Sequence, residues 1–183
     1  MQIEVKIDAA DAQSAIARVL DFMRDPTRVR EAVGELLLDS AQNRIMAGGP
    51  APDGQPWEPL SPAYLLTKKG PGILRESNKL MNKLRWQPTE DGIVIGSDRP
   101  YAAIHQLGGV IKKKARDGTV RLRKVGGRTQ FAKKSHKNAR TLSVRFGEHT
   151  IHIPARPYLG VSEQDKADVV DVIGDLLQKA LRG

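Results

Sequence analysis

Positive charge is concentrated in one segment of this 183-residue chain. The whole chain carries a formal charge of +9, yet residues 112–140 contain twelve Lys or Arg and a single acid, Asp117. That segment therefore carries +11 and leaves −2 for the rest of the chain. Unpaired charges are not buried in apolar interiors, because desolvating them is too costly. The segment must lie at the surface, and the core must come from the residues on either side of it.

The basic segment is compatible with two structures, a long exposed hairpin or a partly disordered loop. Glycines interrupt it at 118, 126 and 127, and the side chains able to pack are those of Val120, Leu122, Val125 and Phe131. We expect it to be mobile in the isolated subunit and to become ordered on assembly, against DNA or an acidic partner.

Clustered cations without acids favour contact with a polyanion through phosphate charge. A solvated surface loop is the alternative, because Phe131 is the only aromatic residue in the segment that could stack on a base. The candidate polyanion-binding residues are Lys112, Lys113, Lys114, Arg116, Arg121, Arg123, Lys124, Arg128, Lys133 and Lys134.

Apolar periodicity on either side of the basic segment predicts both strands and helices. Alternation over 2–7 predicts a strand, and helical spacing predicts helices over 11–24, over 27–47 and after the candidate cap Ser162. Shorter helices are expected over 62–68 and 73–84. Turn residues between apolar runs predict two hairpins, the first pairing Leu84–Gln87 with Ile93–Gly96 and the second pairing Thr141–Phe146 with Thr150–Ile153.

The predicted fold is α+β, with an antiparallel sheet built from the N-terminal strand and the two hairpins, helices packed mainly on one face, and a long basic loop. The length suits a single domain over 1–183, in which a proline-rich excursion at 48–62 and the basic loop at 112–140 are insertions. Cysteine is absent, which excludes disulfides and thiolate zinc sites. With no secretory signal and no run of 18 apolar residues, we expect a soluble chain without membrane contact.

The histidines offer little support for catalysis. His149 and His152 would lie on opposite faces of a strand, and His136 lies among cations, so a shared metal site is not expected. His105 has no acid or second histidine in its own element, which favours a structural role, although a hydrolytic site around it is an alternative. Phosphate-binding loops and nucleophile elbows are also absent from the sequence. We expect no catalytic residue, no metal and no cofactor.

Three stretches, taken in order, resemble the virion morphogenesis or tail-completion proteins of phages such as Mu and P2. They are PDGQPWEPLSPAYLLTKKG (52–70), DRPYAAIHQLGG (98–109) and IPARPYLGVSEQD (153–165), and the resemblance covers about residues 30–180. The chain departs from the family in ILRESNKL, where Ser77 and Asn78 stand in place of a threonine-glycine turn.

The resemblance implies a non-enzymatic structural protein that acts late in tail assembly, at the head-proximal end of the tail or in the neck, as a ring around the DNA channel. The implied partners are further copies of the chain, tail tube or neck proteins, and phage DNA in a nonspecific contact. The implied location is the virion, with assembly in the host cytoplasm. A free-standing, sequence-nonspecific DNA-binding protein that uses 112–140 is the alternative.

Six residues of these stretches are candidates for interface or structural roles. Under this resemblance, residues 101–107 pack as a short helix or turn, and His105 and Gln106 make polar contacts. Arg156 forms a charge-assisted bond within its own subunit or to a neighbour, and Trp57 covers the core or anchors an interface. The full set is Trp57, Tyr101, His105, Gln106, Arg156 and Tyr158.

Overall fold

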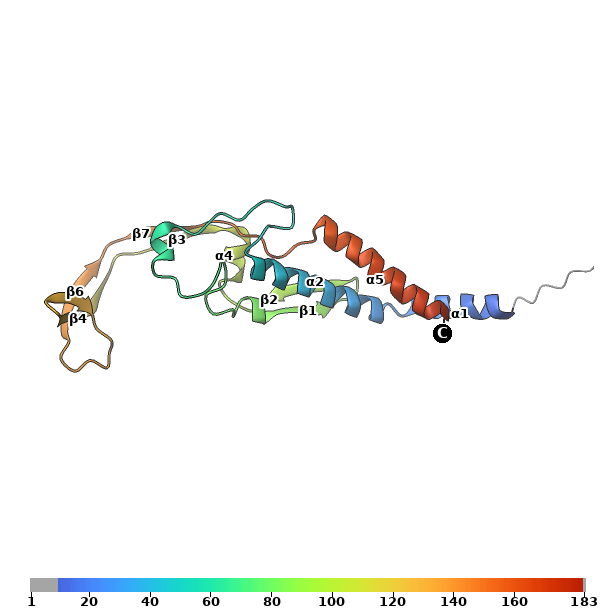
Figure 1. The fold of residues 1–183 in the computed structure, drawn as a ribbon, viewed down its shortest axis with the longest axis horizontal. Helices are drawn as coiled ribbons and strands as arrows, with labels where there is room; N and C mark the ends of the chain where they lie inside the picture. The colour runs from blue at the N-terminus through green and yellow to red at the C-terminus, as the bar shows by residue number, and fades with distance from the viewer. Residues whose placement is uncertain (1–9, 183) are drawn as a thin grey trace, which may run out of the picture. The chain divides into compact units, whose positions relative to one another are not determined.

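The computed structural model describes residues 10–182, so the strand predicted at 2–7 lies outside the described residues. The described chain forms two compact units (Figure 1). The first unit consists of residues 10–107 together with 154–182, and the second unit is Gly108–Ile153. The basic segment 112–140 lies wholly in the second unit, which is wider than the predicted insertion.

The first unit contains the long helices α1 (Ala10–Arg24), α2 (Thr27–Ala47) and α5 (Glu163–Arg182), and α5 packs against both α1 and α2. Helix α2 ends at Gly48, whose left-handed φ of 83° lets its N–H bond back into the last turn. Helix α5 begins with a capping box in which the Ser162 hydroxyl accepts from the Asp165 N–H at 3.1 Å. The helices predicted over 11–24, over 27–47 and after Ser162 are confirmed.

The first hairpin is also confirmed and packs on α2. Strand β1 (Leu84–Pro88) pairs antiparallel with β2 (Ile93–Ser97), with Trp86 opposite Ile95. The Trp86 ring lies over Gly34 of α2, where a Cβ atom would come within 2.5 Å of the ring, and its Nε1 donates to Glu35 Oε1 at 2.8 Å. Glycine at position 34 therefore allows the hairpin to approach the helix.

The shorter helices differ from the prediction. One turn, α3 (Pro62–Leu65), forms within 62–68. The helix predicted over 73–84 is wrong, because only the 3-10 turn η1 (Met81–Lys83) is helical there. Leu74 and Asn78 have φ values of 58° and 55°, which a right-handed helix cannot contain.

The second unit is built from strands β3 (Gly109–Lys113), β4 (Arg116–Val125), β5 (Arg128–Phe131), β6 (Arg140–Phe146) and β7 (His149–Ile153). The predicted pairing of 141–146 with 150–153 is wrong, because β6 pairs with β4 and β7 pairs with β3. Lys113 lies opposite His149 and Arg116 opposite Phe146, so the ladder resumes in the same register after a two-residue break in each chain. The chain at Gly147 thus continues along one ribbon and does not turn back.

The fold is α+β, as predicted, but a single sheet is wrong. The described strands form a β1–β2 pair, a β3–β7 pair and a three-stranded sheet of order β5-β4-β6, all antiparallel. The expected basic loop is mostly strand, which corresponds to the exposed-hairpin alternative. Only residues 132–139, between β5 and β6, form a long strand-free stretch of it.

The hydrophobic core lies in the first unit, and no residue of 108–153 is buried. The buried apolar residues are Ala41, Ile45, Ala51, Trp57, Leu80, Leu84, Ala102 and Tyr158. Within the described part of the chain, no helix is both long enough and apolar enough to cross a membrane. Trp57 and Tyr158 join elements that are distant in sequence, which leads to the site described next.

Candidate functional site

Three segments of the first unit meet at a junction that we call the three-segment junction. It is formed by residues 57–59, by helix α4 (Ala102–Leu107) and by residues 156–159. Tyr158 is almost fully buried, and its hydroxyl donates to the Ala102 carbonyl at 3.2 Å. Trp57 is also buried, and its Nε1 donates to the Pro157 carbonyl at 3.0 Å. Both aromatic side chains therefore pack inside their own subunit.

Gln106 pairs with the extended backbone of residues 158–159. Its Oε1 accepts from the N–H groups of Tyr158 and Leu159, both at 3.0 Å, and its Nε2 donates to the Leu159 carbonyl at 2.9 Å. The neighbouring His105 carbonyl accepts from the Arg156 N–H at 2.8 Å. Backbone groups removed from water require partners, and the end of α4 supplies them for residues 156–159.

Arg156 connects the same segment to the proline-rich excursion. Its guanidinium is buried and donates from Nε and Nη2 to the Glu58 carbonyl at 3.0 and 2.9 Å, with a longer contact of 3.4 Å to the Pro59 carbonyl. Burial lowers the pKa of Arg156, and the nearby Glu58 carboxylate acts in the opposite direction. The guanidinium thus fastens residues 58–59 to the junction, which is the intramolecular one of its two predicted roles.

His105 lies half-buried beside this arginine. Its ring meets the Tyr101 ring edge-on, with centroids 5.9 Å apart, and its buried Nδ1 has no hydrogen-bond partner among the described residues. Burial lowers the pKa of His105, and the positive charge of Arg156 lowers it further. The imidazole is consequently neutral near pH 7. Within residues 10–182, no group of three or more His, Cys, Asp or Glu is placed to hold a metal ion.

The expected packing of residues 101–107 is only partly correct. Ala102 is buried, but Tyr101 and Leu107 are exposed. Helix α4 has six residues, fewer than two turns, so it can press only one narrow face onto the core. The two exposed apolar side chains remain available at the surface.

A buried ion pair supports the junction from the other side. Arg44 Nη1 donates to the Tyr158 carbonyl at 2.8 Å, and Nη2 contacts Asp165 Oδ2 at 3.2 Å, with side chains only 8% and 6% exposed. Asp165 Oδ2 also accepts from the N–H and hydroxyl of Ser162, both at 2.7 Å. Burial raises the pKa of Asp165, but hydrogen bonds from Ser40 and Ser162 and the charge of Arg44 outweigh it and hold this pKa below its usual value.

The Arg44–Asp165 pair was not predicted from the sequence, in which Asp165 is only the residue three positions after the candidate cap Ser162. One signal was available, because Arg44 lies four residues after Ser40 and next to Ile45 on the buried side of α2. A cation in that position requires a buried partner.

Comparison with known proteins identifies the family. The sequence model of the phage virion morphogenesis family matches residues 7–178, which include both units. The chain belongs to the phage virion morphogenesis family. The stretches 52–70, 98–109 and 153–165, which suggested this family, all contribute residues to the three-segment junction. In this member of the family, they form one hydrogen-bonded structural unit.

Two relatives match over nearly their whole length. The chain is 28% identical over 183 residues to "Mu-like prophage FluMu G protein 2" of Haemophilus influenzae, covering 98% of this chain and 99% of that protein. It is 23% identical over 187 residues to "Putative capsid assembly protein G" of Escherichia phage Mu, covering 100% of this chain and 98% of that protein. No solved structure matches. A structural role in phage virion assembly is therefore supported for this chain.

The candidate polyanion-binding residues of this family member do not form one surface. Lys112 and Lys113 belong to β3, Lys114 lies in the break after it, Arg116, Arg121, Arg123 and Lys124 belong to β4, Arg128 belongs to β5, and Lys133 and Lys134 lie in the following loop. Successive residues of a strand point to opposite faces. The cations of β4 are consequently divided between its two faces.

Two of these arginines have structural contacts. Arg121 donates to the Lys134 carbonyl at 2.6 Å and to the His136 carbonyl at 2.7 Å, which holds the loop 132–139 against β4. The Arg116 guanidinium lies 4.8 Å from the centre of the Phe146 ring. The remaining candidates make no ion pair within the described chain.

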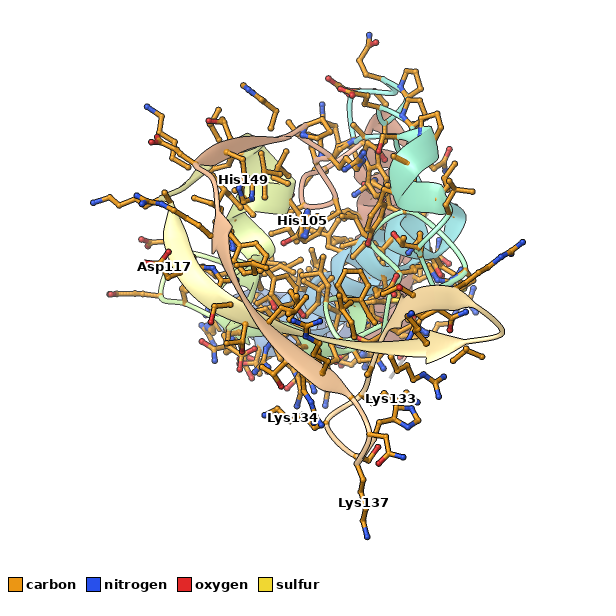
Figure 2. All side chains as sticks on the ribbon, turned by 90° about the vertical axis from the view of Figure 1, so that its left-hand side faces the viewer. His105, Asp117, Lys133, Lys134, Lys137 and His149 are labelled. Atoms are coloured by element: carbon orange, nitrogen blue, oxygen red, sulfur yellow. The ribbon has the colours of Figure 1, made fainter. Side chains whose placement is uncertain are left out.

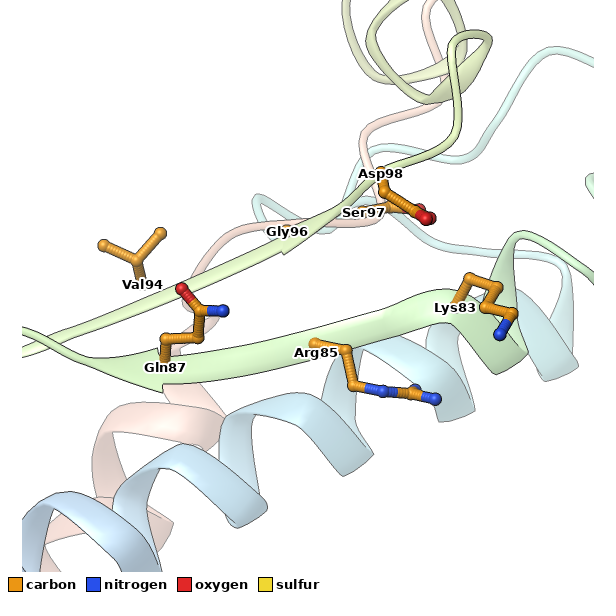
Figure 3. Close-up of a pocket in the computed structure, with 7 residues that line it drawn as sticks. All are labelled: Lys83, Arg85, Gln87, Val94, Gly96, Ser97 and Asp98. Atoms are coloured by element: carbon orange, nitrogen blue, oxygen red, sulfur yellow. The ribbon is translucent and has the colours of Figure 1, made fainter.

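An open groove lies on the outer face of the β1–β2 hairpin (Figure 3). Trp86 points toward α2, so the alternate residues of β1 point away from that helix. Arg85, Gln87 and Val94 on this face are exposed. The groove is lined by Lys83, Arg85, Gln87, Val94, Gly96, Ser97 and Asp98.

Proposed function

We propose that the protein is a non-enzymatic structural component of phage tail completion, which acts at the head-proximal end of the tail or in the neck as a homo-oligomeric ring around the DNA channel. The match of the virion morphogenesis family to residues 7–178 carries this proposal. The relative from phage Mu is named for capsid assembly, which agrees with a role in building the particle. The position in the tail, the ring and the lack of catalysis are our inference from the family resemblance.

The three-segment junction supports a structural role. It joins the proline-rich excursion, α4 and residues 156–159 through partly buried hydrogen bonds from Trp57, Gln106 and Arg156. Surfaces formed by fixed segments lose little conformational entropy on association. A subunit of this kind is prepared to bind its neighbours with a defined geometry.

Exposed apolar side chains near the junction support self-association. Tyr64, Leu65 and Leu66 are consecutive and are 45%, 56% and 89% exposed. Single exposed apolar residues are common, but a contiguous exposed run is typical of an interaction surface. We propose that this run at α3 contacts a neighbouring copy in the ring.

The first test measures oligomeric state in solution. The purified chain should form a discrete oligomer by size-exclusion chromatography with light scattering, and Leu65→Ser with Leu66→Ser should shift it toward monomer. Leu181→Ser, which changes an exposed leucine near the end of α5, is the matched control and should leave the oligomer intact. Circular dichroism should show that all variants are folded.

The second test follows the particle. Deleting the gene should give filled heads and unattached tails by electron microscopy, and wild-type virions should contain the protein by mass spectrometry. A strictly monomeric protein together with virions that lack it would refute the proposal. Normal virions from the deletion strain would refute it as well.

A further inference from the structure

The second unit carries strong positive charge without internal compensation. It contains the +11 segment 112–140, and none of the salt bridges within the described chain involves residues 108–153. None of its residues is buried, so no large core offsets the repulsion among the cations. A bound polyanion would remove that repulsion.

One face of the β5-β4-β6 sheet, which we call the apolar face, carries most of the apolar side chains of the sheet and also Arg116, Lys124 and Arg140. Val120 and Leu122 of β4 lie opposite Leu142 and Arg140 of β6, and Leu122 also lies opposite Phe131 of β5. Directly opposed residues in an antiparallel sheet share a face. Phe131 is 80% exposed on this face. Both aromatic residues of the sheet belong to it, because Phe146 lies opposite Arg116, an even number of positions from Val120.

The other face of the sheet is cationic. Arg121 and Arg123 point to it from β4 together with one acid, Asp117. Arg145 of β6 shares it because it lies opposite Asp117, and Arg128 of β5 shares it because it lies opposite Val125. The two backbone hydrogen bonds of Arg121 hold the loop 132–139 across this face. Lys133, Lys134 and Lys137 are exposed on that loop, and Figure 2 shows Lys137 extending away from the strands.

We propose that this cationic face, through Arg128 and the loop residues Lys133, Lys134 and Lys137, binds the phosphate backbone of double-stranded DNA without sequence specificity. This DNA contact goes beyond the proposed function, because a ring can form and join head to tail without touching DNA. Arg121 acts as a positioning residue that keeps the lysine loop in place.

The position of the aromatic rings selects the kind of ligand. Proteins that bind single strands place aromatic rings beside the cations so that bases can stack. Phe131 and Phe146 lie on the face opposite to Arg128 and the lysine loop, and the Phe146 ring is already packed against Arg116. Protein partners prefer an apolar centre with a charged rim, whereas residues Thr119, Thr141 and Ser143 make the centre of the cationic face polar. A duplex backbone requires only positive charge at a polar surface.

The test uses the full-length protein and two unrelated 30-base-pair duplexes of DNA, with affinity measured by fluorescence anisotropy between about 50 and 200 mM salt. Each neutralised phosphate contributes about −0.9 to the slope of log affinity against log salt. The double variant Lys133→Gln with Lys134→Gln should therefore reduce the magnitude of the slope by about 1.8. Over this fourfold rise in salt, wild type should lose about tenfold more affinity than the variant.

A matched double variant separates the cationic face from net charge. Lys124→Gln with Arg140→Gln also removes two positive charges, but from the apolar face of the same sheet. The slope of its log affinity against log salt should stay within about 0.5 of wild type. Urea unfolding and oligomeric state are measured for both variants, so that loss of DNA binding is distinguished from misfolding and from loss of the ring.

Three results would overturn the inference. The first is a flat salt response or no binding to duplex DNA. The second is an equal slope change in both double variants, which would assign the effect to net charge and not to this face. The third is equal competition by polyglutamate at the same charge concentration, which would indicate an acidic protein partner. An intact oligomer that does not bind DNA would refute this inference and leave the proposed function standing.

Discussion

Gln106 offers the most direct test of the three-segment junction. Its side chain satisfies two backbone N–H groups and one carbonyl of residues 158–159, at 3.0, 3.0 and 2.9 Å. Replacement by methionine keeps nearly the same length and volume but removes all three hydrogen bonds. The change therefore isolates the hydrogen bonds from packing.

The expected loss of stability follows from the groups left without partners. A buried donor or acceptor without a partner costs about 1–3 kcal/mol, and carbonyl groups tolerate the loss better than N–H groups. The site is only partly buried, so water can replace some of the lost bonds. We expect Gln106→Met to reduce the free energy of unfolding by about 2–4 kcal/mol, which lowers Tm by roughly 4–16 °C at this chain length.

Two further variants make the test specific. Gln106→Glu keeps an acceptor for the N–H groups of Tyr158 and Leu159 but cannot donate to the Leu159 carbonyl, so it should lose about 1 kcal/mol. Gln87→Met, on the exposed outer face of β1, is the matched control and should stay within about 0.5 kcal/mol of wild type.

Urea unfolding followed by tryptophan fluorescence is the appropriate assay, because both tryptophans, Trp57 and Trp86, lie in the first unit. The midpoint should fall without a change in m-value. If Gln106→Met matches wild type within about 0.5 kcal/mol, these side-chain hydrogen bonds do not hold the junction together. A larger loss in the glutamate variant than in the methionine variant would also contradict the reasoning.

Four further predictions concern the first unit. Arg44→Met leaves the Asp165 carboxylate buried without its cation and should cost about 3–5 kcal/mol by urea unfolding, part of which the added change Asp165→Asn should restore. The folded pKa of Asp165 lies below its ordinary value of 3.8, so the ionised carboxylate contributes fully to stability above pH 3.8 and this contribution is lost as the pH falls below 3.8. Asp165→Asn should remove this acid dependence of the unfolding free energy. An unchanged dependence in the variant would contradict the pairing. The pKa of His105 is likewise lowered from 6.5, so the unfolding free energy of wild type should decrease as the pH falls from 7 to about 5, and His105→Gln should flatten that decrease when both are measured by urea titration. Leu176→Asp should make the protein insoluble, because α5 packs on α1 and α2 through its apolar side; soluble, assembly-competent protein in a sedimentation assay would show that this packing is dispensable.

The elements that could be predicted from the sequence are those fixed by local patterns. Helices α1, α2 and α5 follow from apolar spacing and from end signals such as Gly48 and Ser162. The β1–β2 hairpin follows from two alternating runs joined by a short turn. In each case the residues that specify the element lie close together in the sequence, so a short window of residues is enough to predict the element.

Strand partners were decided only by the tertiary structure. Residues 141–146 and 150–153 were correctly predicted as strands, but both pair with strands from 109–125 and not with each other. The local alternative at Gly147 would pair only a few residues, whereas the long ribbon pairs seven residues of β6 and five of β7. A strand's sequence records its exposed and buried faces but not which edge it pairs with.

The roles of the polar junction residues were also decided by the tertiary structure. The sequence alone identified Trp57, Gln106, Arg156 and Tyr158 as candidates, but it left open whether they act within the subunit or between subunits. Gln106 and Arg156 find their backbone partners about fifty and about one hundred positions away. Composition and periodicity determine which residues can be buried, whereas a hydrogen bond of this kind is specified only when folding removes both groups from water at the same place.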